Sequence, residues 1–385
     1  LSIQVLRIMF PYLALISLVA FASGIQNTHQ KFSVPAFTPV VFNVILIIAA
    51  SFIAPNYDMP ILVLAWGVLL AGFVQLIIQI SPLINIDKLP VPKLDFNNEG
   101  VKKFMTIIFP AIIAGGILQI NLLIDTIFAS LLETGSPTWL YISDRLIQFP
   151  MGIFAIAIGT VLLPTLSKYN LSTEKNNFIK TIKKGQKFVL FIGIPSLIGL
   201  FYCAEDLIST IFYRGAFTEA DVINSSYSLM AFSFGLPFFM LMKVLTPAFF
   251  SRKDTTTPMR VALISLFLNA VLNYWLAFVL GLGHVGIAIG SSLAALVSVC
   301  ILEFILYRSG FIKSYTFVSR FSVMILVASC SLVLFLHFYT QTINFIELDH
   351  LDRVLFLFIE VTIAALIYFT ISRVIYGKSL RKIFE

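Results

Sequence analysis

Charged residues are scarce in this sequence. Aspartate, glutamate, lysine and arginine make up 12% of its 385 residues, whereas hydrophobic residues make up 59%. A soluble domain carries about twice that charged fraction. The chain therefore lacks the polar side chains to cover its own surface, which excludes a soluble globular protein and indicates that lipid is its solvent.

Cysteines and catalytic motifs are also scarce. The three cysteines, Cys203, Cys300 and Cys330, lie in or beside apolar runs, and their spacing suits neither a disulfide framework nor a zinc site. The four histidines are scattered, and neither His-Glu-x-x-His nor Gly-x-Ser-x-Gly occurs. We therefore expect no enzyme, no bound metal and no cofactor.

Long apolar runs, by contrast, fill the chain. A run of about 18 or more such residues crosses a membrane as a helix. The predicted crossings are 8–27, 35–54, 60–81, 104–130, 139–164, 186–211, 223–250, 258–280, 284–307, 317–340 and 353–376. Because these runs are continuous rather than alternating, they predict an all-α polytopic transmembrane helix bundle of about eleven helices.

Lysine and arginine lie almost entirely in alternate loops between these runs. The positive-inside rule then predicts a cytoplasmic C-terminus. It also explains the net charge of +7 by membrane orientation, without a nucleic-acid partner. An odd number of crossings would leave Leu1 outside with no signal to take it there, so we expect an odd number of further crossings upstream.

An internal similarity leads to the same expectation. A short loop followed by Pro35 starts a helix that carries Asn43, and a later loop followed by Pro258 starts a helix that carries Asn269. Read as a parallel repeat, this predicts two six-helix halves and two extra helices, with three helices missing from the first half.

Ionisable side chains inside predicted crossings cost about 2.5–3.5 kcal/mol and call for a reason. Asp144 and Arg145 lie several residues inside the run 139–164, followed by Gln148. The guanidinium of Arg145 suits a phosphate, and we expect it to face a cavity rather than to snorkel to the outer headgroups. Lys243, in the middle of the run 223–250, is a second candidate for this cavity.

A second polar group lies deeper in the predicted bundle. Asp125 has polar neighbours along its own run, and Asn269 and Asn273 share one face of a later helix because they are four residues apart. One carboxylate and two amide oxygens suit a hard cation such as sodium. A hydrogen-bonded polar core explains the same residues equally well. Glu360, in the last run, has no evident role.

Several motifs together resemble those of the MurJ (MviN) lipid II flippases, members of the multidrug/oligosaccharidyl-lipid/polysaccharide exporter superfamily. The most extensive is Tyr141-Ile-Ser-Asp-Arg-Leu-Ile-Gln-Phe-Pro-Met-Gly152. Others are Asp125-Thr-Ile-Phe-Ala-Ser130, Phe212-Tyr-Arg-Gly-Ala-Phe-Thr218 and Phe250-Ser-Arg-Lys-Asp-Thr-Thr-Thr-Pro258. The likeness extends over essentially the whole chain.

This resemblance implies helices four to fourteen of a fourteen-helix, two-lobed exporter fold. It divides the chain into the remainder of the N-terminal lobe (1–87), a cytoplasmic linker (88–103), the C-terminal lobe (104–312), and two extra helices with a basic tail (313–385). The two extra helices form a groove for a lipid tail in the family.

The resemblance also implies a function. The family moves lipid II, a polyprenyl-pyrophosphate-linked disaccharide peptide, from the cytoplasmic to the periplasmic leaflet of the bacterial inner membrane by alternating access. Arg145, Asp144, Gln148 and Lys243 would meet the substrate, and Asp125, Asn269 and Asn273 a coupling sodium ion, with a proton as the alternative. We expect a monomer whose partners are lipid II and membrane lipids.

Two other interpretations remain open. A related exporter of drugs or polysaccharide precursors, coupled to a cation gradient, would share the fold but have an acidic, aromatic cavity. A membrane enzyme acting on polyprenyl phosphates would need clustered acids for magnesium, and the cytoplasmic loops offer only scattered ones.

Overall fold

The computed structural model describes residues 1–29, 31–86, 99–169, 171, 173–311 and 320–377. Within these ranges the regular structure is helical throughout, with no strand. The chain forms two compact units, Leu1–Lys103 (unit 1) and Phe104–Glu385 (unit 2).

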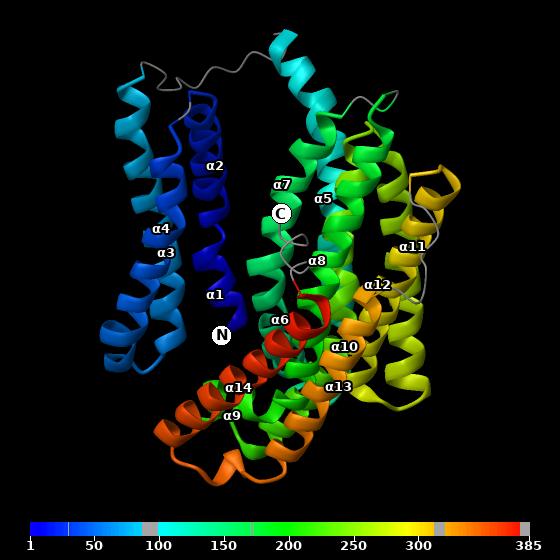
Figure 1. The fold of residues 1–385 in the computed structure, drawn as a ribbon. Helices are drawn as coiled ribbons and strands as arrows, with labels where there is room; N and C mark the ends of the chain where they lie inside the picture. Colours follow the sequence, from blue (N-terminus) through cyan, green and yellow to red (C-terminus); the bar gives the residue numbers. More distant parts are fainter. Residues whose placement is uncertain (30, 87–98, 170, 172, 312–319, 378–385) are drawn as a thin grey trace. The chain divides into compact units, whose positions relative to one another are not determined.

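Unit 1 is a small bundle in which α4 packs against α1, α2 and α3. Figure 1 shows these helices in blue. Its helices are α1 (Ser2–Met9), α2 (Tyr12–Thr28), α3 (Ser33–Ile48) and α4 (Pro60–Ile84), with a π-helical turn η1 (Ala49–Ile53) and a 3-10 turn η2 (Ala54–Asn56) after α3.

Buried amides connect the helices of unit 1. Gln79 of α4 donates to Ser23 Oγ at 2.9 Å and to Thr38 Oγ1 at 3.0 Å, and it accepts a hydrogen bond from Gln26. Gln75 donates to the Thr38 carbonyl oxygen at 3.0 Å. An unpaired amide in this apolar setting would be costly, so the network fixes how α2, α3 and α4 pack.

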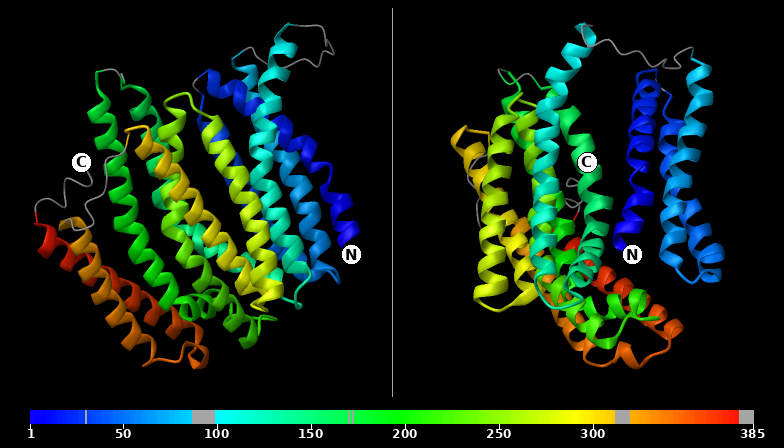
Figure 2. Two further views of the ribbon diagram at one scale, coloured as in Figure 1. Left: turned by 90° about the vertical axis from the view of Figure 1, so that its right-hand side faces the viewer. Right: turned by 180° about the vertical axis from the view of Figure 1, so that it is seen from behind.

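Unit 2 is built around the long helix α10, which packs against α6, α7, α8, α9 and α12. Figure 2 shows this unit from two further sides. Its helices are α5 (Glu99–Ser130, mostly in this unit), α6 (Ser136–Pro150), α7 (Ile156–Ser167), α8 (Lys175–Tyr202), α9 (Ala204–Phe212), α10 (Glu219–Phe250), α11 (Thr256–Tyr274), α12 (Gly283–Arg308), α13 (Arg320–Thr340) and α14 (His350–Tyr376). The π-helical turns η3 (Met151–Ala155) and η4 (Trp275–Val279) follow α6 and α11, and a 3-10 turn η5 (Phe345–Glu347) precedes α14.

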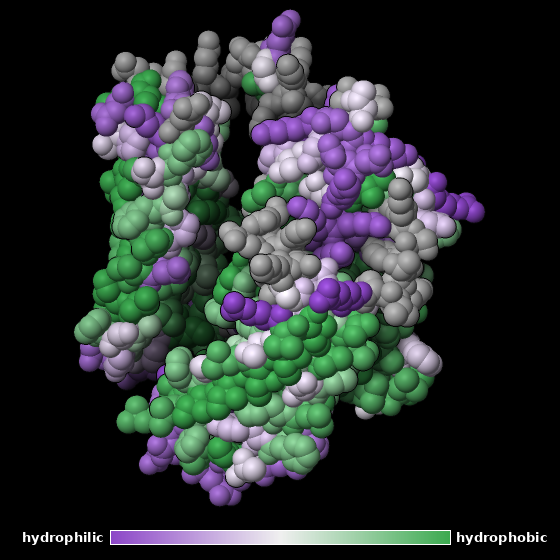
Figure 3. All heavy atoms as spheres, in the orientation of Figure 1, coloured by the Kyte–Doolittle hydropathy of each residue, from purple (hydrophilic) through white to green (hydrophobic). Residues whose placement is uncertain are grey.

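The predicted all-α membrane bundle is confirmed. Ten helical segments of the described residues are long and apolar enough to cross a membrane, and they correspond to ten of the predicted runs. The eleventh run, 104–130, lies within the 32-residue helix α5. In Figure 3, apolar residues cover the outward surface of α13 and α14, as expected of helices that face lipid.

One predicted boundary is wrong. The run 186–211 merges two elements, because the structure has α8 from Lys175 to Tyr202 and a separate short helix, α9, after Cys203. The first part of α8 is amphipathic: Phe178 and Ile182 are buried, while the lysines between them and beyond are more exposed. A search for continuous apolar residues misses such a start.

The domain boundaries stay predictions in part. Residues 88–98 of the predicted linker 88–103 lie outside the described residues, as does the tail 378–385. The two compact units meet between Lys103 and Phe104. Helices α13 and α14 belong to the same compact unit as α5 to α12, and α13 packs along α8.

Candidate functional site

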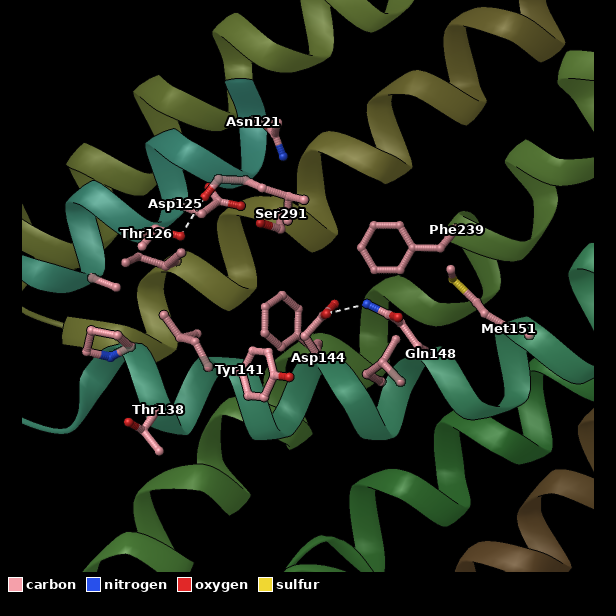
Figure 4. Close-up of a pocket in the computed structure, with 18 residues that line it drawn as sticks. Asn121, Asp125, Thr126, Thr138, Tyr141, Asp144, Gln148, Met151, Phe239 and Ser291 are labelled. Carbon is pink, nitrogen blue, oxygen red and sulfur yellow. Dashed lines mark hydrogen bonds between the residues drawn. The ribbon is translucent and has the colours of Figure 1, made fainter. Parts of the chain in front are cut away.

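A cavity of about 730 Å³, lined by both polar and apolar side chains, lies within unit 2, among α5, α6, α10 and α12. Figure 4 shows its lining. The polar or aromatic lining residues are Asn121, Asp125, Thr126, Thr138, Tyr141, Asp144, Gln148, Phe232, Phe239 and Ser291. Because these helices are otherwise apolar spans, the polar side chains find in this cavity the partners that lipid would not offer.

Helix α6 is held in place by its first turns. It begins after Gly135, whose φ of 109° suits glycine and whose missing Cβ leaves room for the Trp139 ring. Trp139 Nε1 donates to Asp221 Oδ1 of α10 at 2.7 Å, and Ser143 Oγ donates to the Ser225 carbonyl oxygen at 2.7 Å. These bonds fix the rotation of α6 against α10 and so decide which side chains face the cavity.

Asp144 and Gln148 face the cavity together. They are four residues apart on α6, and Gln148 Nε2 donates to Asp144 Oδ2. Just beyond them, the π-helical turn η3 places Met151 and Gly152 in the lining. A π turn widens the helix and breaks its regular bonding, so this wall of the cavity can deform.

Arg145 does not line the cavity. Its side chain is exposed, and its guanidinium carbon lies 4.8 Å from the centre of the Tyr141 ring, a cation–π contact one turn back along α6. No described residue accepts a hydrogen bond from this guanidinium. Tyr141 does line the cavity, so Arg145 is connected to it through the ring on which it rests.

Asp125, Asn273 and Asn269 form one hydrogen-bonded chain, as their spacing predicts. Asn273 Nδ2 donates to Asp125 Oδ1 at 2.6 Å and to Asn269 Oδ1 at 3.0 Å, and Asn269 Nδ2 donates to Ser291 Oγ at 2.9 Å. Asn273 is fully buried, and its Oδ1 has no partner. That oxygen lies against Gly290 of α12, where any Cβ would overlap it.

The ionisable groups of the described lining are acids. The lining contains the carboxyl groups of Asp125 and Asp144 and neither lysine nor arginine among the lining residues that the structure describes. Lys243 is exposed on α10, away from the lining, with its backbone close to Gly159 of α7. The structure thus brings together Asp144, Gln148, Asp125 and the two asparagines, and leaves Arg145 and Lys243 outside the cavity wall.

Some residues of the site were not predicted from the sequence. The most important are Gly290 and Ser291, which meet Asn273 and Asn269 only because α12 packs along α11. Asp221 is a further case: it forms a capping box with Thr218 and accepts the Trp139 bond. The spacing Thr218-x-x-Asp221 before an apolar run was a usable signal for that cap.

Comparison with known proteins agrees with this architecture. The family model described as "Lipid II flippase MurJ" matches residues 1–351. A probable lipid II flippase MurJ of Vibrio cholerae is 44% identical over 305 residues, which cover 79% of this chain and 58% of that protein. Its counterpart in Haemophilus influenzae is 37% identical over 375 residues, covering 94% of this chain and 72% of that protein.

A solved structure is similar over nearly the whole chain. The structure titled "Lipid II flippase MurJ, inward closed conformation" superposes with a TM-score of 0.79 at 27% identity, covering 99% of this chain and 75% of that one. The chain therefore spans a little over half to three quarters of the length of these relatives. Taken together, the family match, the curated relatives and the shared helical architecture show that this chain belongs to the MurJ family of lipid II flippases.

Proposed function

We propose that this chain takes part in moving lipid II from the cytoplasmic to the periplasmic leaflet by alternating access. The observation that carries the proposal is the family match over residues 1–351, which includes every element of the unit 2 cavity. The polar side chains of this cavity offer a hydrophilic headgroup hydrogen-bonding partners that the lipid interior denies it.

The lining suits a sugar and peptide headgroup. Asp144, Gln148 and Tyr141 offer a carboxylate, an amide and a hydroxyl, which can exchange hydrogen bonds with hydroxyl and amide groups of a substrate. For the pyrophosphate, Arg145 is the nearest candidate on α6. Its guanidinium rests on an aromatic ring rather than in an ion pair, so it can turn to a phosphate without breaking a strong bond. Lys243 would contribute only after a larger rearrangement.

A sodium ion is the proposed coupling ion, held by Asp125, Asn269 and Asn273. In the present arrangement the Asn273 amide nitrogen lies between two oxygens of the other residues. Rotating the Asn273 side-chain amide by half a turn would exchange its two end atoms. The unpartnered Oδ1 would then lie where Nδ2 lies now, between the oxygens of Asp125 and Asn269. Three oxygens would then converge, which suits a hard cation. A proton on Asp125 is the alternative.

The membrane, the partners and the energy source that we propose are those of the same family. The chain is a multi-pass membrane protein, and we place it in the bacterial inner membrane with its C-terminus in the cytoplasm, because lysine and arginine concentrate in alternate loops. Lipid II and membrane lipids are its partners, with no nucleic acid and no second copy required. We propose transport without an enzymatic reaction, driven by an ion gradient or by the membrane potential, which supplies about 2.3 kcal/mol per charge per 100 mV.

The test is made in the bacterium that carries this protein. The protein is depleted conditionally, and the lipid II exposed at the periplasmic face is measured while wild type or a variant is supplied. We expect Arg145→Ala to lower flipping at least tenfold, Arg145→Lys to restore it in part, and Lys243→Ala to change it little. Full activity of Arg145→Ala would remove Arg145 from the mechanism.

One observation favours a second function. The described lining is acidic and aromatic, as expected for an exporter of cationic drugs or for a relative that carries polysaccharide precursors with a cation gradient. Depletion separates the two: lysis with accumulated lipid II supports the flippase, whereas drug sensitivity with normal lipid II export supports the alternative.

A further inference from the structure

Two buried acids meet where the last helix packs on the short helix α9. Glu360, near the middle of α14, is 0% exposed, and Asp206, in the first turn of α9, is 6% exposed. The two side chains are neighbours, because α14 packs on α9 and each carboxyl group acts on the other. We call Asp206 and Glu360 the carboxyl pair. They lie apart from the cavity, whose lining includes neither of them.

No cation offsets the pair within the described residues. Arg353 of α14 is held by other groups: its Nη1 and Nη2 donate to the carbonyl oxygens of Ser209 and Ile346, at 3.4 and 2.8 Å, and its guanidinium stacks on Tyr213. Its buried Nε donates to no acceptor of the described residues, the two carboxyl groups included.

The other titratable neighbours cannot supply a positive charge. Cys203, just before α9, donates its thiol to Glu360 Oε1 at 3.1 Å. Tyr339 of α13 donates to the Phe356 carbonyl oxygen at 3.3 Å, and Glu205 of α9 is a further acid. His337 of α13 is exposed and contacts Tyr202 and Gln341 instead.

One oxygen of each carboxyl group in the pair lacks a hydrogen-bond donor. Asp206 Oδ2 and Glu360 Oε2 are both buried, and neither accepts a hydrogen bond from any N–H, O–H or S–H of the residues that the structure describes. Two adjacent carboxylates in an apolar setting cannot both stay ionised. One proton would remove half of the charge and turn the repulsion into a strong O–H···O⁻ bond.

We propose that Asp206 and Glu360 form a proton-binding site that fastens α14 to α9, and that loss of the proton weakens this attachment. The proton belongs to the pair rather than to either residue. The site goes beyond the proposed transport function, because neither residue lies in the cavity. It makes the packing of α14 against α9, within unit 2, dependent on pH.

The pH range follows from Asp206, which lies outside the membrane-spanning helices. Burial, and then the neighbouring Glu360 carboxyl, raises the pKa of Asp206 to about 8. In an unfolded chain the pKa of an aspartate is about 3.9. Since the folded state keeps its proton to higher pH, the stabilisation is complete below about pH 4 and is lost as pH rises toward 8.

The first experiment compares thermal unfolding of the purified chain in detergent between pH 5 and pH 9. We expect the melting temperature of wild type to fall as pH rises over this range. The double variant Asp206→Asn/Glu360→Gln can form a hydrogen bond between its two side-chain amides but has no titrating group. Its melting temperature should therefore change little between pH 5 and pH 9. A matched control, Glu347→Gln/Asp349→Asn, alters two exposed acids beside α14. Its melting temperature should fall with rising pH as that of wild type does. The proposal would be overturned if the melting temperature of the double variant Asp206→Asn/Glu360→Gln fell with rising pH as much as that of wild type.

The second experiment needs no variant to fold. Infrared difference spectra of the wild-type chain should show the carbonyl stretch of a protonated carboxylic acid at neutral pH, disappearing as pH rises through about 8. The spectra are recorded in sodium and in choline chloride, because a cation is the other possible partner. A protonated band that is present in choline but absent in sodium at neutral pH would overturn the proton site, as would no band in either salt.

Discussion

Unit 2 contains acids in two different settings, and their neighbours decide what each can bind. In the cavity, Asp125 and Asp144 each accept a hydrogen bond from an amide, Asn273 and Gln148 respectively. At the α9–α14 contact, the carboxyl groups of Asp206 and Glu360 have, among the described residues, each other and the weak thiol donor of Cys203. An amide N–H can donate to a carboxyl oxygen but cannot be lost as a proton, so each cavity acid has a neutral donor beside it, an arrangement compatible with the proposed cation. The carboxyl pair instead requires a proton.

The contrast between the cavity acids and the carboxyl pair depends first on Asn273, whose amide donates to Asp125. We expect Gly290→Ala to have the largest effect, because the new Cβ would overlap Asn273 Oδ1 and push its amide away from Asp125. Overpacking and the lost bond to a charged group together should cost about 3 kcal/mol of unfolding free energy. Unfolding in detergent measures it, with Gly199→Ala as the control, since nothing lies within 4 Å of a Cβ there. Equal stabilities would show that the amide is not fixed by α12.

The second prediction concerns a substitution that places two carboxyl groups side by side in the cavity, as in the carboxyl pair. Asn273→Asp replaces the amide donor of Asp125 by another carboxyl, so a proton becomes necessary. We expect a loss of about 2 kcal/mol at neutral pH, recovered as pH falls, because the folded state then binds a proton that the unfolded state releases. Asn224→Asp, on α10 outside the lining, is the control and should show no such recovery. A pH-independent loss would indicate simple steric damage.

The third prediction tests the cation. If the cavity carboxylates bind sodium, the ion should stabilise the chain by about 1.4 kcal/mol at ten times its Kd. Melting temperatures in sodium and choline chloride at equal ionic strength measure this. Asp125→Asn should abolish the difference, whereas the double variant of the carboxyl pair should keep it. A sodium effect that survives Asp125→Asn would place the ion elsewhere.

The smallest expected effect concerns Cys203. Its thiol is the donor to Glu360 Oε1, but a thiol is a weak donor and the shared proton supplies the stronger bond. Cys203→Ala should therefore cost about 1 kcal/mol and leave the pH dependence of stability intact. The exposed Cys300→Ala gives the baseline. Loss of the pH dependence in Cys203→Ala would mean that the thiol, rather than the second carboxyl, completes the site.

The sequence predicts the helices well where a helix is apolar all round and poorly where it is not. The apolar runs locate ten crossings, since lipid imposes a length on each. The amphipathic start of α8 and the break at Cys203 are invisible to that reasoning, because they depend on which face packs against α10 and α13.

The site divides in the same way. The spacing of Asn269 and Asn273 predicts their common face, and their contact with Asp125 follows once the helices pack. By contrast, whether Arg145 or Asp144 faces the cavity depends on the rotation of α6, which is fixed by Trp139 and Ser143 through contacts with α10. The partner of Glu360 lies on a helix more than a hundred residues earlier, so no local pattern reveals it.

The π-helical turns have a consequence for the history of the fold. One follows α3 in unit 1 (Ala49–Ile53) and one follows α11 in unit 2 (Trp275–Val279), and these are the two helices that the internal similarity pairs. A π turn typically accommodates one residue inserted into an older, regular helix. If the two helices descend from one repeat, as the internal similarity predicts, the insertion preceded the duplication, whereas the third π turn, after α6, arose separately. Deleting one residue from either turn would rewind the end of that helix by about 100°, and the two halves should tolerate this equally if they still share the ancestral arrangement.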